Sequence, residues 1–202
     1  MITRHPPSQT NCMEYNGALG SGFRSDGDSV GKFILGLIIG LLAIPIAVYF
    51  YFVTGMAPVA TSAQAMPFEK TLAKKALNAR VEKEMPKTVP IAADEATYLA
   101  GADVYRENCA VCHGLPGQQE TKIAHGMFPF PPQLFKGKGV TDDPAGETYW
   151  KATNGIRLTG MPAFKSTLSD TQLWQVSLLL ANADKVPQSV KDRLARPLKP
   201  PE

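Results

Sequence analysis

The sequence has little net charge, few histidines and cysteines, and no strand-like segments. Its formal net charge is +3 over 202 residues, whereas a nucleic-acid-binding domain normally carries a strongly basic stripe, so we expect no nucleic-acid partner. No segment alternates apolar with polar residues as a half-buried β-strand does, and no internal repeat is present. These absences disfavour a β-rich fold and a βαβ setting, and they leave an all-α fold.

One long apolar run, residues 33–53, contains no charged side chain. At 1.5 Å per residue it would span about 31 Å as a helix, close to the roughly 30 Å of a bilayer core. Pro45 lies inside the run and can kink it, and the aromatic residues at 49–52 are typical of a membrane interface. We predict a transmembrane anchor over 33–53, preceded by a disordered tail over 1–32 that is rich in Gly, Ser, Asn and Asp.

Other modes of attachment are less well supported by the N-terminal region. Residues 63–65 form an A-x-A pattern that resembles the peptidase site of a cleaved signal peptide. However, the apolar core of a signal peptide is typically about 7–15 residues long, shorter than this run, and the run ends well before Ala63. Cys12 has no hydrophobic stretch before it, which disfavours a lipoprotein anchor, so we interpret it as an ordinary free thiol.

Residues 54–93 are predicted to be a linker or stalk. Within them, residues 68–84 place Leu72, Leu77 and Val81 at helical spacing among lysines and glutamates, which predicts an exposed or weakly packed helix. Two prolines, at positions 86 and 90, then end the helical pattern.

Residues 94–187 are predicted to form a small helical domain. Its helices are expected over residues 95–108, from an N-cap at Asp143 to Gly155, and from a capping box formed by Ser169 and Gln172. Residues 114–140 are rich in Gly and Pro and are expected to be mostly loop. The basic, proline-rich segment 188–202 is expected to be a surface tail.

Cys109, Cys112 and His113 form C-x-x-C-H, the pattern of c-type haem attachment. Two thiols at this spacing can add to the two vinyl groups of one haem, and the adjacent imidazole is then placed beneath the iron as the proximal ligand. A zinc site built on this cysteine pair would need a second pair of ligands, and the only other histidines are His5 and His125. A redox dithiol would require a βαβ setting, which the sequence lacks.

The sixth iron ligand must come from elsewhere in the chain. Met161 is the first candidate, because Gly160 and Pro162 would hold its backbone rigidly, and a His/Met pair raises the reduction potential of a haem. His125 and Met127 are the alternatives. The alternative is that Met161 does not bind the iron and only fills a gap in the core, which is the ordinary role of a methionine side chain.

These motifs resemble those of class I cytochromes c, in their membrane-anchored bacterial form. The resemblance covers residues 95–184, under half of the chain. Gly101 and Tyr105 match the family's first helix, whose glycine permits a close helix crossing. Trp174 and Leu178 match the positions on the family's last helix that meet it.

A proline loop adds to the resemblance. Pro132 matches the proline of the family's Pro-x-Leu, with Pro129 and Pro131 close by. The resemblance implies that the carbonyl oxygen of Pro132 accepts a hydrogen bond from the proximal imidazole, a bond of the kind that fixes the orientation of a ligand.

The resemblance also implies a fold, a cofactor and a compartment. The fold is the all-α class I cytochrome c fold with one N-terminal transmembrane helix. The cofactor is one covalent haem c on Cys109 and Cys112, with His113 and Met161 as iron ligands. Because c-type haem is attached outside the cytoplasmic membrane, we expect a single-pass protein of the inner membrane with its haem domain in the periplasm and its N-terminal tail in the cytoplasm.

The expected function is single-electron transfer in a respiratory or photosynthetic chain, because a six-coordinate haem leaves no position for a small-molecule substrate. We therefore expect an electron carrier rather than an enzyme, with redox proteins as partners. The alternative is a haem c subunit fixed within a quinol-oxidising, terminal oxidase or periplasmic dehydrogenase complex. A haem enzyme or gas sensor would require that Met161 does not bind the iron.

Three cations lie near the Met161 loop in the sequence. Arg157 and Lys165 flank it, and Lys151 lies a little upstream. If they surround an exposed haem edge, they would favour an acidic partner and mainly raise the association rate. The alternative is ordinary solvated surface charge.

Overall fold

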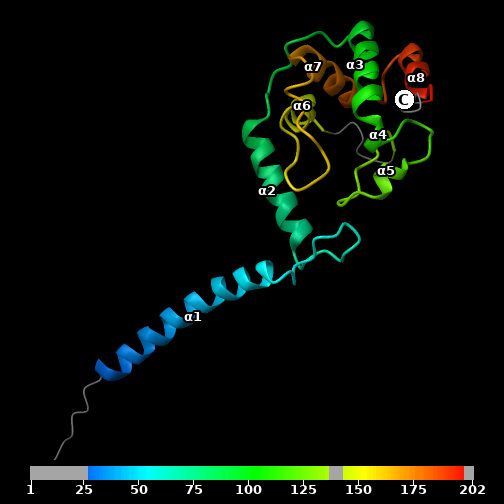
Figure 1. Cartoon of the computed structure of the whole chain (residues 1–202). Helices are drawn as coiled ribbons and strands as arrows, with labels where there is room; N and C mark the ends of the chain where they lie inside the picture. The colour runs from blue at the N-terminus through cyan, green and yellow to red at the C-terminus, as the bar shows by residue number, and fades with distance from the viewer. Residues whose placement is uncertain (1–26, 137–142, 198–202) are drawn as a thin grey trace, which may run out of the picture. The chain divides into compact units, whose positions relative to one another are not determined.

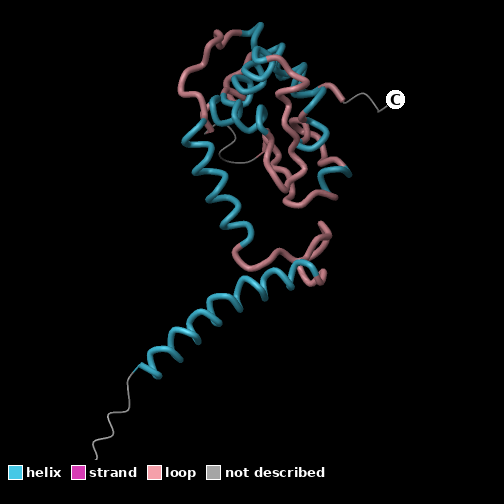
Figure 2. The backbone as a smooth tube through the Cα atoms, turned by 60° about the vertical axis from the view of Figure 1, so that its left-hand side comes forward, coloured by secondary structure: helices cyan, strands magenta, loops and turns pink. Residues whose placement is uncertain are grey.

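The computed structural model describes residues 27–136 and 143–197. The chain divides into two units, Met1–Met56 and Ala57–Glu202. Among the described residues, Figure 2 shows helices joined by loops and no strand. This confirms the predicted all-α fold class.

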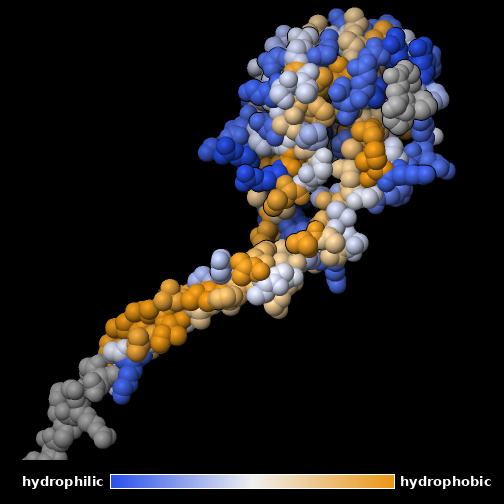
Figure 3. Space-filling model, viewed as in Figure 1, coloured by the Kyte–Doolittle hydropathy of each residue, from blue (hydrophilic) through white to orange (hydrophobic). Residues whose placement is uncertain are grey.

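The first unit contains one long helix, α1, over Gly27–Val53. It begins at Gly27 rather than Phe33, so residues 27–32, which we assigned to the disordered tail, are helical, and residues 1–26 lie outside the described residues. A helix that has already formed extends readily into neighbouring polar residues when no proline stops it. By length and composition Ser29–Val53 could cross a membrane, and Figure 3 shows apolar surface along this helix.

The core of the second unit is built on three helices: α3 (Glu95–Asn108), α7 (Asp170–Ala181) and α8 (Gln188–Ala195). Helix α3 packs against both α7 and α8 (Figure 1). Tyr105, Leu179 and Val190 contribute side chains that are fully buried between these helices. Burial of these and neighbouring apolar side chains is the main force that stabilises the unit.

Side-chain caps begin two of these helices where the sequence indicates. The Asp94 carboxylate accepts a hydrogen bond from the Thr97 amide at 2.8 Å, at the start of α3. At the start of α7, Ser169 and Gln172 form both halves of the predicted capping box. Each such cap satisfies amide groups that the helix itself leaves without partners.

The crossing of α3 and α7 depends on Gly101. A Cβ atom at this position would lie 2.3 Å from the carbonyl oxygen of Gln175 and 3.2 Å from the Cβ of Leu179. The close helix crossing expected at Gly101 is therefore present, although Gln175 and Leu179, and not Trp174 and Leu178, stand directly opposite the glycine.

Gly101→Ala should destabilise the domain, because the added methyl group meets backbone atoms that can move only if α7 shifts. We expect the free energy of unfolding to fall by about 1–3 kcal/mol, measured by denaturant titration of the haem-loaded protein. Gly126→Ala is the matched control, because its Cβ would lie no closer than 3.6 Å to another atom. Equal effects of the two substitutions would contradict the role given to Gly101.

Helix α6 (Ala145–Asn154) packs on α7 through aromatic stacking. The rings of Tyr149 and Trp174 are 4.2 Å apart and nearly parallel. The cap of α6 differs from our expectation by one residue: Pro144 itself, in an extended conformation, is the N-cap in place of Asp143.

The expected surface tail after residue 187 contains α8, and this part of the prediction was wrong. Val190 and Leu194, four residues apart, are buried against α3, and Arg193 pairs with Asp103 of α3 at 2.7 Å. Arg106 of α3 also donates to the carbonyl oxygens at the end of α8. The segment is basic and rich in proline, so Val190 and Leu194 alone did not predict a packed helix.

Helix α2 (Glu69–Glu84) lies within the same compact unit and packs against α6 (Figure 1). Its bounds agree with the predicted helix, but the segment is not a separate stalk. Two further short helices, α4 (Ala110–His113) and α5 (Lys122–His125), complete the unit.

Candidate functional site

The second unit contains a cavity of about 470 Å³. Its walls include the end of α3, α4, the loop at 127–136, parts of α6 and α7, the loop at 156–164, and Leu77 of α2. Pockets that bind small molecules or cofactors typically have volumes of about 300–1,000 Å³. Cys109, Cys112, His113 and Met161, which the sequence singles out, all line it.

The C-x-x-C-H residues form a single helical turn. The amides of Cys112 and His113 donate to the carbonyl oxygen of Cys109 at 3.1 and 2.9 Å, while the Cys109 amide continues α3 by donating to Tyr105. Residues three and four apart on a helix share one face, so the two thiols and the imidazole project to the same side. All three line the cavity.

His113 is oriented by the proline loop. Its Nδ1 lies 2.8 Å from the carbonyl oxygen of Pro132, so the tautomer with hydrogen on Nδ1 donates this bond. The remaining nitrogen, Nε2, is then available to a metal. Burial lowers the pKa of His113, an effect that the Pro132 bond partly opposes, and this favours the neutral imidazole that binds metals.

The loop that carries Met161 closes back on the end of α6. The amide of Ile156 donates to the Met161 carbonyl oxygen at 3.2 Å, and the Met161 amide donates to the Thr159 hydroxyl at 3.1 Å. Gly155 has a positive φ of 65°, and a Cβ there would lie 2.7 Å from the Ala163 amide nitrogen. These contacts hold Met161 at the cavity wall.

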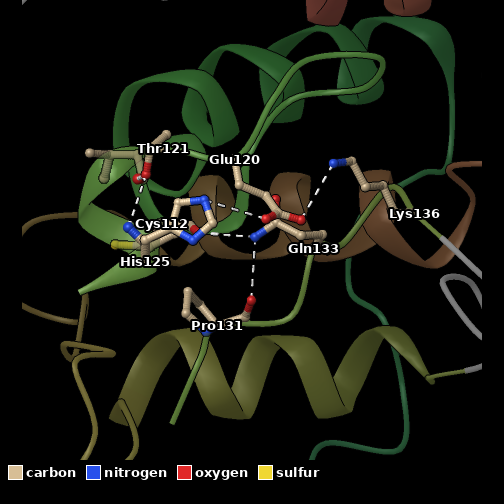
Figure 4. A network of polar contacts seen from close by, with 9 residues as sticks. Cys112, Glu120, Thr121, His125, Pro131, Gln133 and Lys136 are labelled. Carbon is tan, nitrogen blue, oxygen red and sulfur yellow. Dashed lines mark hydrogen bonds and ion pairs between the residues drawn. The ribbon is translucent and has the colours of Figure 1, made fainter. Parts of the chain in front are cut away.

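The two alternative sixth ligands lie in different surroundings. Met127 also lines the cavity, and its terminal methyl group lies against Gly160. His125 is on the surface: its side chain is 62% exposed and its Nε2 is 3.6 Å from the Glu120 carboxylate, which is also 3.6 Å from Lys136 (Figure 4). The structure therefore brings two methionines, and not His125, to the cavity.

Burial also affects the ionisation of Cys109 and the hydrogen bonding of Tyr105 in α3. It raises the pKa of Cys109 to about 12, and the neighbouring Cys112 contributes to this rise. A thiol that stays protonated is a poor nucleophile for dithiol redox chemistry. The hydroxyl of Tyr105, which is buried, donates to the Gly114 carbonyl oxygen at 2.8 Å and so ties α3 to the residue that follows His113.

Comparisons with known proteins agree with this geometry. Residues 96–178 match the family model described as cytochrome C oxidase, cbb3-type, subunit III. These residues form a c-type cytochrome domain. The chain is also 34% identical over 85 residues to a cytochrome c subunit of alcohol dehydrogenase (quinone) from Gluconobacter oxydans (strain 621H). That alignment covers 38% of this chain and 16% of the relative, and no solved structure matches the chain.

The cavity of the cytochrome domain fits a haem c. It presents two thiols and an imidazole on one helical turn, thioether side chains from two other segments, and apolar walls that include Val176 and Leu180 of α7. Electron transfer is the function of such domains, and the predicted resemblance to c-type cytochromes is confirmed.

Gln133 is a supporting residue of the cytochrome domain that our sequence analysis missed. Its side-chain amide donates to the carbonyl oxygens of Cys112 and Pro131, at 3.4 and 3.3 Å (Figure 4). Its Oε1 lies so close to Gly114 that a Cβ there would be 2.2 Å away. Gln133 thus joins the turn of the C-x-x-C-H motif to the loop that holds His113, and only Gly114, immediately after His113, hinted at such a contact.

Gln133→Leu should loosen this connection while it keeps most of the side-chain volume. We expect the free energy of unfolding of the haem-loaded protein to fall by about 1–2 kcal/mol, since two long hydrogen bonds are lost. The reduction potential should rise, because a weaker bond to Pro132 makes the His113 imidazole less basic. Gln188→Leu, at an exposed position of α8, is the control, and a similar change in both variants would contradict the role of Gln133.

The cations near the Met161 loop differ in their ion pairing and exposure. Lys151 pairs with Glu147 at 2.5 Å and with Asp143 at 3.4 Å, so its charge is largely compensated. Arg157 is exposed, and next to it Leu158 has a positive φ of 59° and is 94% exposed. An exposed apolar residue in a strained conformation is more typical of a functional surface than of a core.

Proposed function

We propose that this protein transfers single electrons through one haem c, bound covalently by Cys109 and Cys112 and ligated by His113 and Met161. The observation that carries the proposal is that these four side chains, from two segments far apart in the sequence, line one cavity. When bound, the haem iron supplies the chemistry by gaining and losing one electron.

The residues of the chain would bind and orient the cofactor. The Pro132 carbonyl group holds the His113 imidazole in one orientation, and Gln133 supports the loop that supplies this acceptor. Met161, on a loop closed by Gly155, would complete the coordination of the iron and exclude small-molecule substrates from it. Such a site supports electron exchange with redox proteins and leaves substrate chemistry to those partners.

We further propose that α1 is an uncleaved, single-pass anchor in the inner membrane and that the haem-binding unit, which begins at Ala57, lies in the periplasm. The length and composition of α1 support the anchor. The compartment follows from the chemistry of the C-x-x-C-H motif, since c-type haem is attached outside the cytoplasm. The protein would then act near membrane-bound redox partners, where an anchor raises its effective concentration.

A second function, as a fixed subunit of an oxidoreductase complex, is favoured by the comparisons. Both the matching family and the relative from Gluconobacter oxydans are described as subunits, one of an oxidase and the other of a quinone-dependent alcohol dehydrogenase. Purification in mild detergent distinguishes the two functions: a free carrier is isolated alone, whereas a subunit is isolated with stoichiometric partners.

The proposed function is tested on the full chain in detergent. We expect one haem per chain, haem that stays with the polypeptide after denaturation in acidic acetone, and a redox titration that follows a one-electron curve. A chain that holds no haem, or that releases it intact on extraction, would overturn the proposal.

A further inference from the structure

Helix α2 lies outside the residues that match the cytochrome family, which begin at residue 96, but inside the same compact unit. Its sequence is highly charged, and most of its side chains are exposed. Only two of its apolar side chains are substantially covered: Val81, which is 2% exposed, and Leu77, which is half-buried. The surroundings of these two residues show what the helix does.

The C-terminal end of α2 is fastened to α6. The indole nitrogen of Trp150 donates to the Glu84 carboxylate at 3.2 Å. Beyond the helix, Pro86 touches the first turn of α6 so closely that a Cβ on Gly146 would lie 2.0 Å from the Pro86 carbonyl oxygen. Since only glycine allows this approach, the contact is a specific one.

The N-terminal end of α2 contacts the loop at 127–136, which forms another part of the cavity wall. The ammonium group of Lys70 lies 5.4 Å from the centre of the Phe128 ring, a favourable cation–π distance. Phe128 lies between Met127 and Pro129, which both line the cavity. Helix α2 therefore contacts a cavity-forming loop at one end and a cavity-forming helix at the other.

Leu77 lies midway between these two contacts and itself lines the cavity. Lys70, Leu77 and Glu84 are spaced by seven residues, so they share one face of the helix over about 21 Å of its axis. The face of α2 that contacts the cytochrome domain is thus the face that carries Leu77 into the cavity wall.

We infer that α2 is part of the cofactor pocket and that Leu77 excludes water from the bound haem, an inference that rests on the proposed function. The segment before the cytochrome domain then acts as one wall of the pocket and not as a passive stalk. Oxidised haem carries one more positive charge than reduced haem, and an apolar, water-excluding wall disfavours that charge. Leu77 therefore helps to keep the reduction potential high.

The test compares two leucines on the same helix. Leu77→Asp places a carboxylate in the cavity wall, whereas Leu72→Asp adds the same charge at a position that is 64% exposed. In the full chain in detergent, Leu77→Asp should shift the equilibrium of electron exchange with a fixed mediator at least tenfold toward the oxidised protein. This is a fall of about 59 mV in potential, and Leu72→Asp should change it much less.

A second variant tests the same inference from outside the cavity. Gly146→Ala should push Pro86 away from α6, lower the potential in the same direction, and speed cleavage of α2 by trypsin at Lys74, Lys75 or Arg80. This variant also decides the matter if Leu77→Asp does not fold.

Two results would overturn the inference: equal shifts in the two aspartate variants, or a Gly146→Ala chain whose α2 is cleaved faster while its haem and potential are unchanged. A wild-type chain without haem would instead contradict the proposed function. The two failures are therefore distinguishable.

Discussion

Replacing Cys109 and Cys112 together by alanine should abolish covalent retention of haem. Both thiols line the cavity from one helical turn, and each is expected to form one bond to the cofactor. Without them, haem could be held only through His113 and Met161. After denaturation in acidic acetone the polypeptide should therefore be colourless, whereas the wild-type polypeptide should keep the full haem absorbance.

Cys12→Ala is the matched control for the cysteine pair. It removes the third cysteine of the sequence, which lies outside the C-x-x-C-H motif. The covalent haem should therefore be unchanged. Each single replacement, Cys109→Ala or Cys112→Ala, should leave one bond and an altered absorption spectrum. Full colour in the double variant after extraction would contradict the attachment site.

Met161→Ala should open the sixth coordination position of the iron. The thioether is the only proposed ligand on that side, and alanine cannot replace it. We expect loss of the Met–iron charge-transfer band in the oxidised spectrum, rapid binding of carbon monoxide by the reduced protein, and a lower reduction potential, because a Met/His pair raises the potential.

Met127→Ala and His125→Ala are the two controls for the sixth ligand. Met127 lines the same cavity, so its loss tests whether any methionine at the wall would serve. His125 lies on the surface next to Glu120, so its replacement should leave the spectrum unchanged. If Met161→Ala keeps the native spectrum while either control loses it, the ligand is the residue changed in that control.

Local sequence determined most of the helix boundaries. Helix α3 begins after Asp94 and α7 begins after Ser169, because a capping side chain and the first helical turn are close together in the chain. The turn at Cys109 to His113 is equally local: two thiols and an imidazole share a face as soon as the segment becomes helical. The C-x-x-C-H motif therefore indicated the cofactor class without any tertiary information.

Only the tertiary structure showed that segments outside the expected domain belong to it. Helix α8 is held by Val190, Leu194 and the Arg193–Asp103 pair, and α2 by Val81, the Trp150–Glu84 bond and the contact between Pro86 and Gly146. In each helix only one or two large apolar side chains are covered, among many charged residues, so the amphipathic pattern is weak. Their burial depends on a surface that α3 and α6 create.

The sequence by itself determined an apolar helix of membrane length, an all-α domain and the C-x-x-C-H turn, because each of these follows from composition or from residues a few positions apart. The tertiary structure decided which side chains share the cavity with that turn. Met161 and Met127 line the cavity, whereas His125 does not. Gln133 and Leu77 also line it, although no sequence pattern predicted this position for either residue. Such contacts arise between segments distant in the chain, and their positions depend on how whole helices and loops pack.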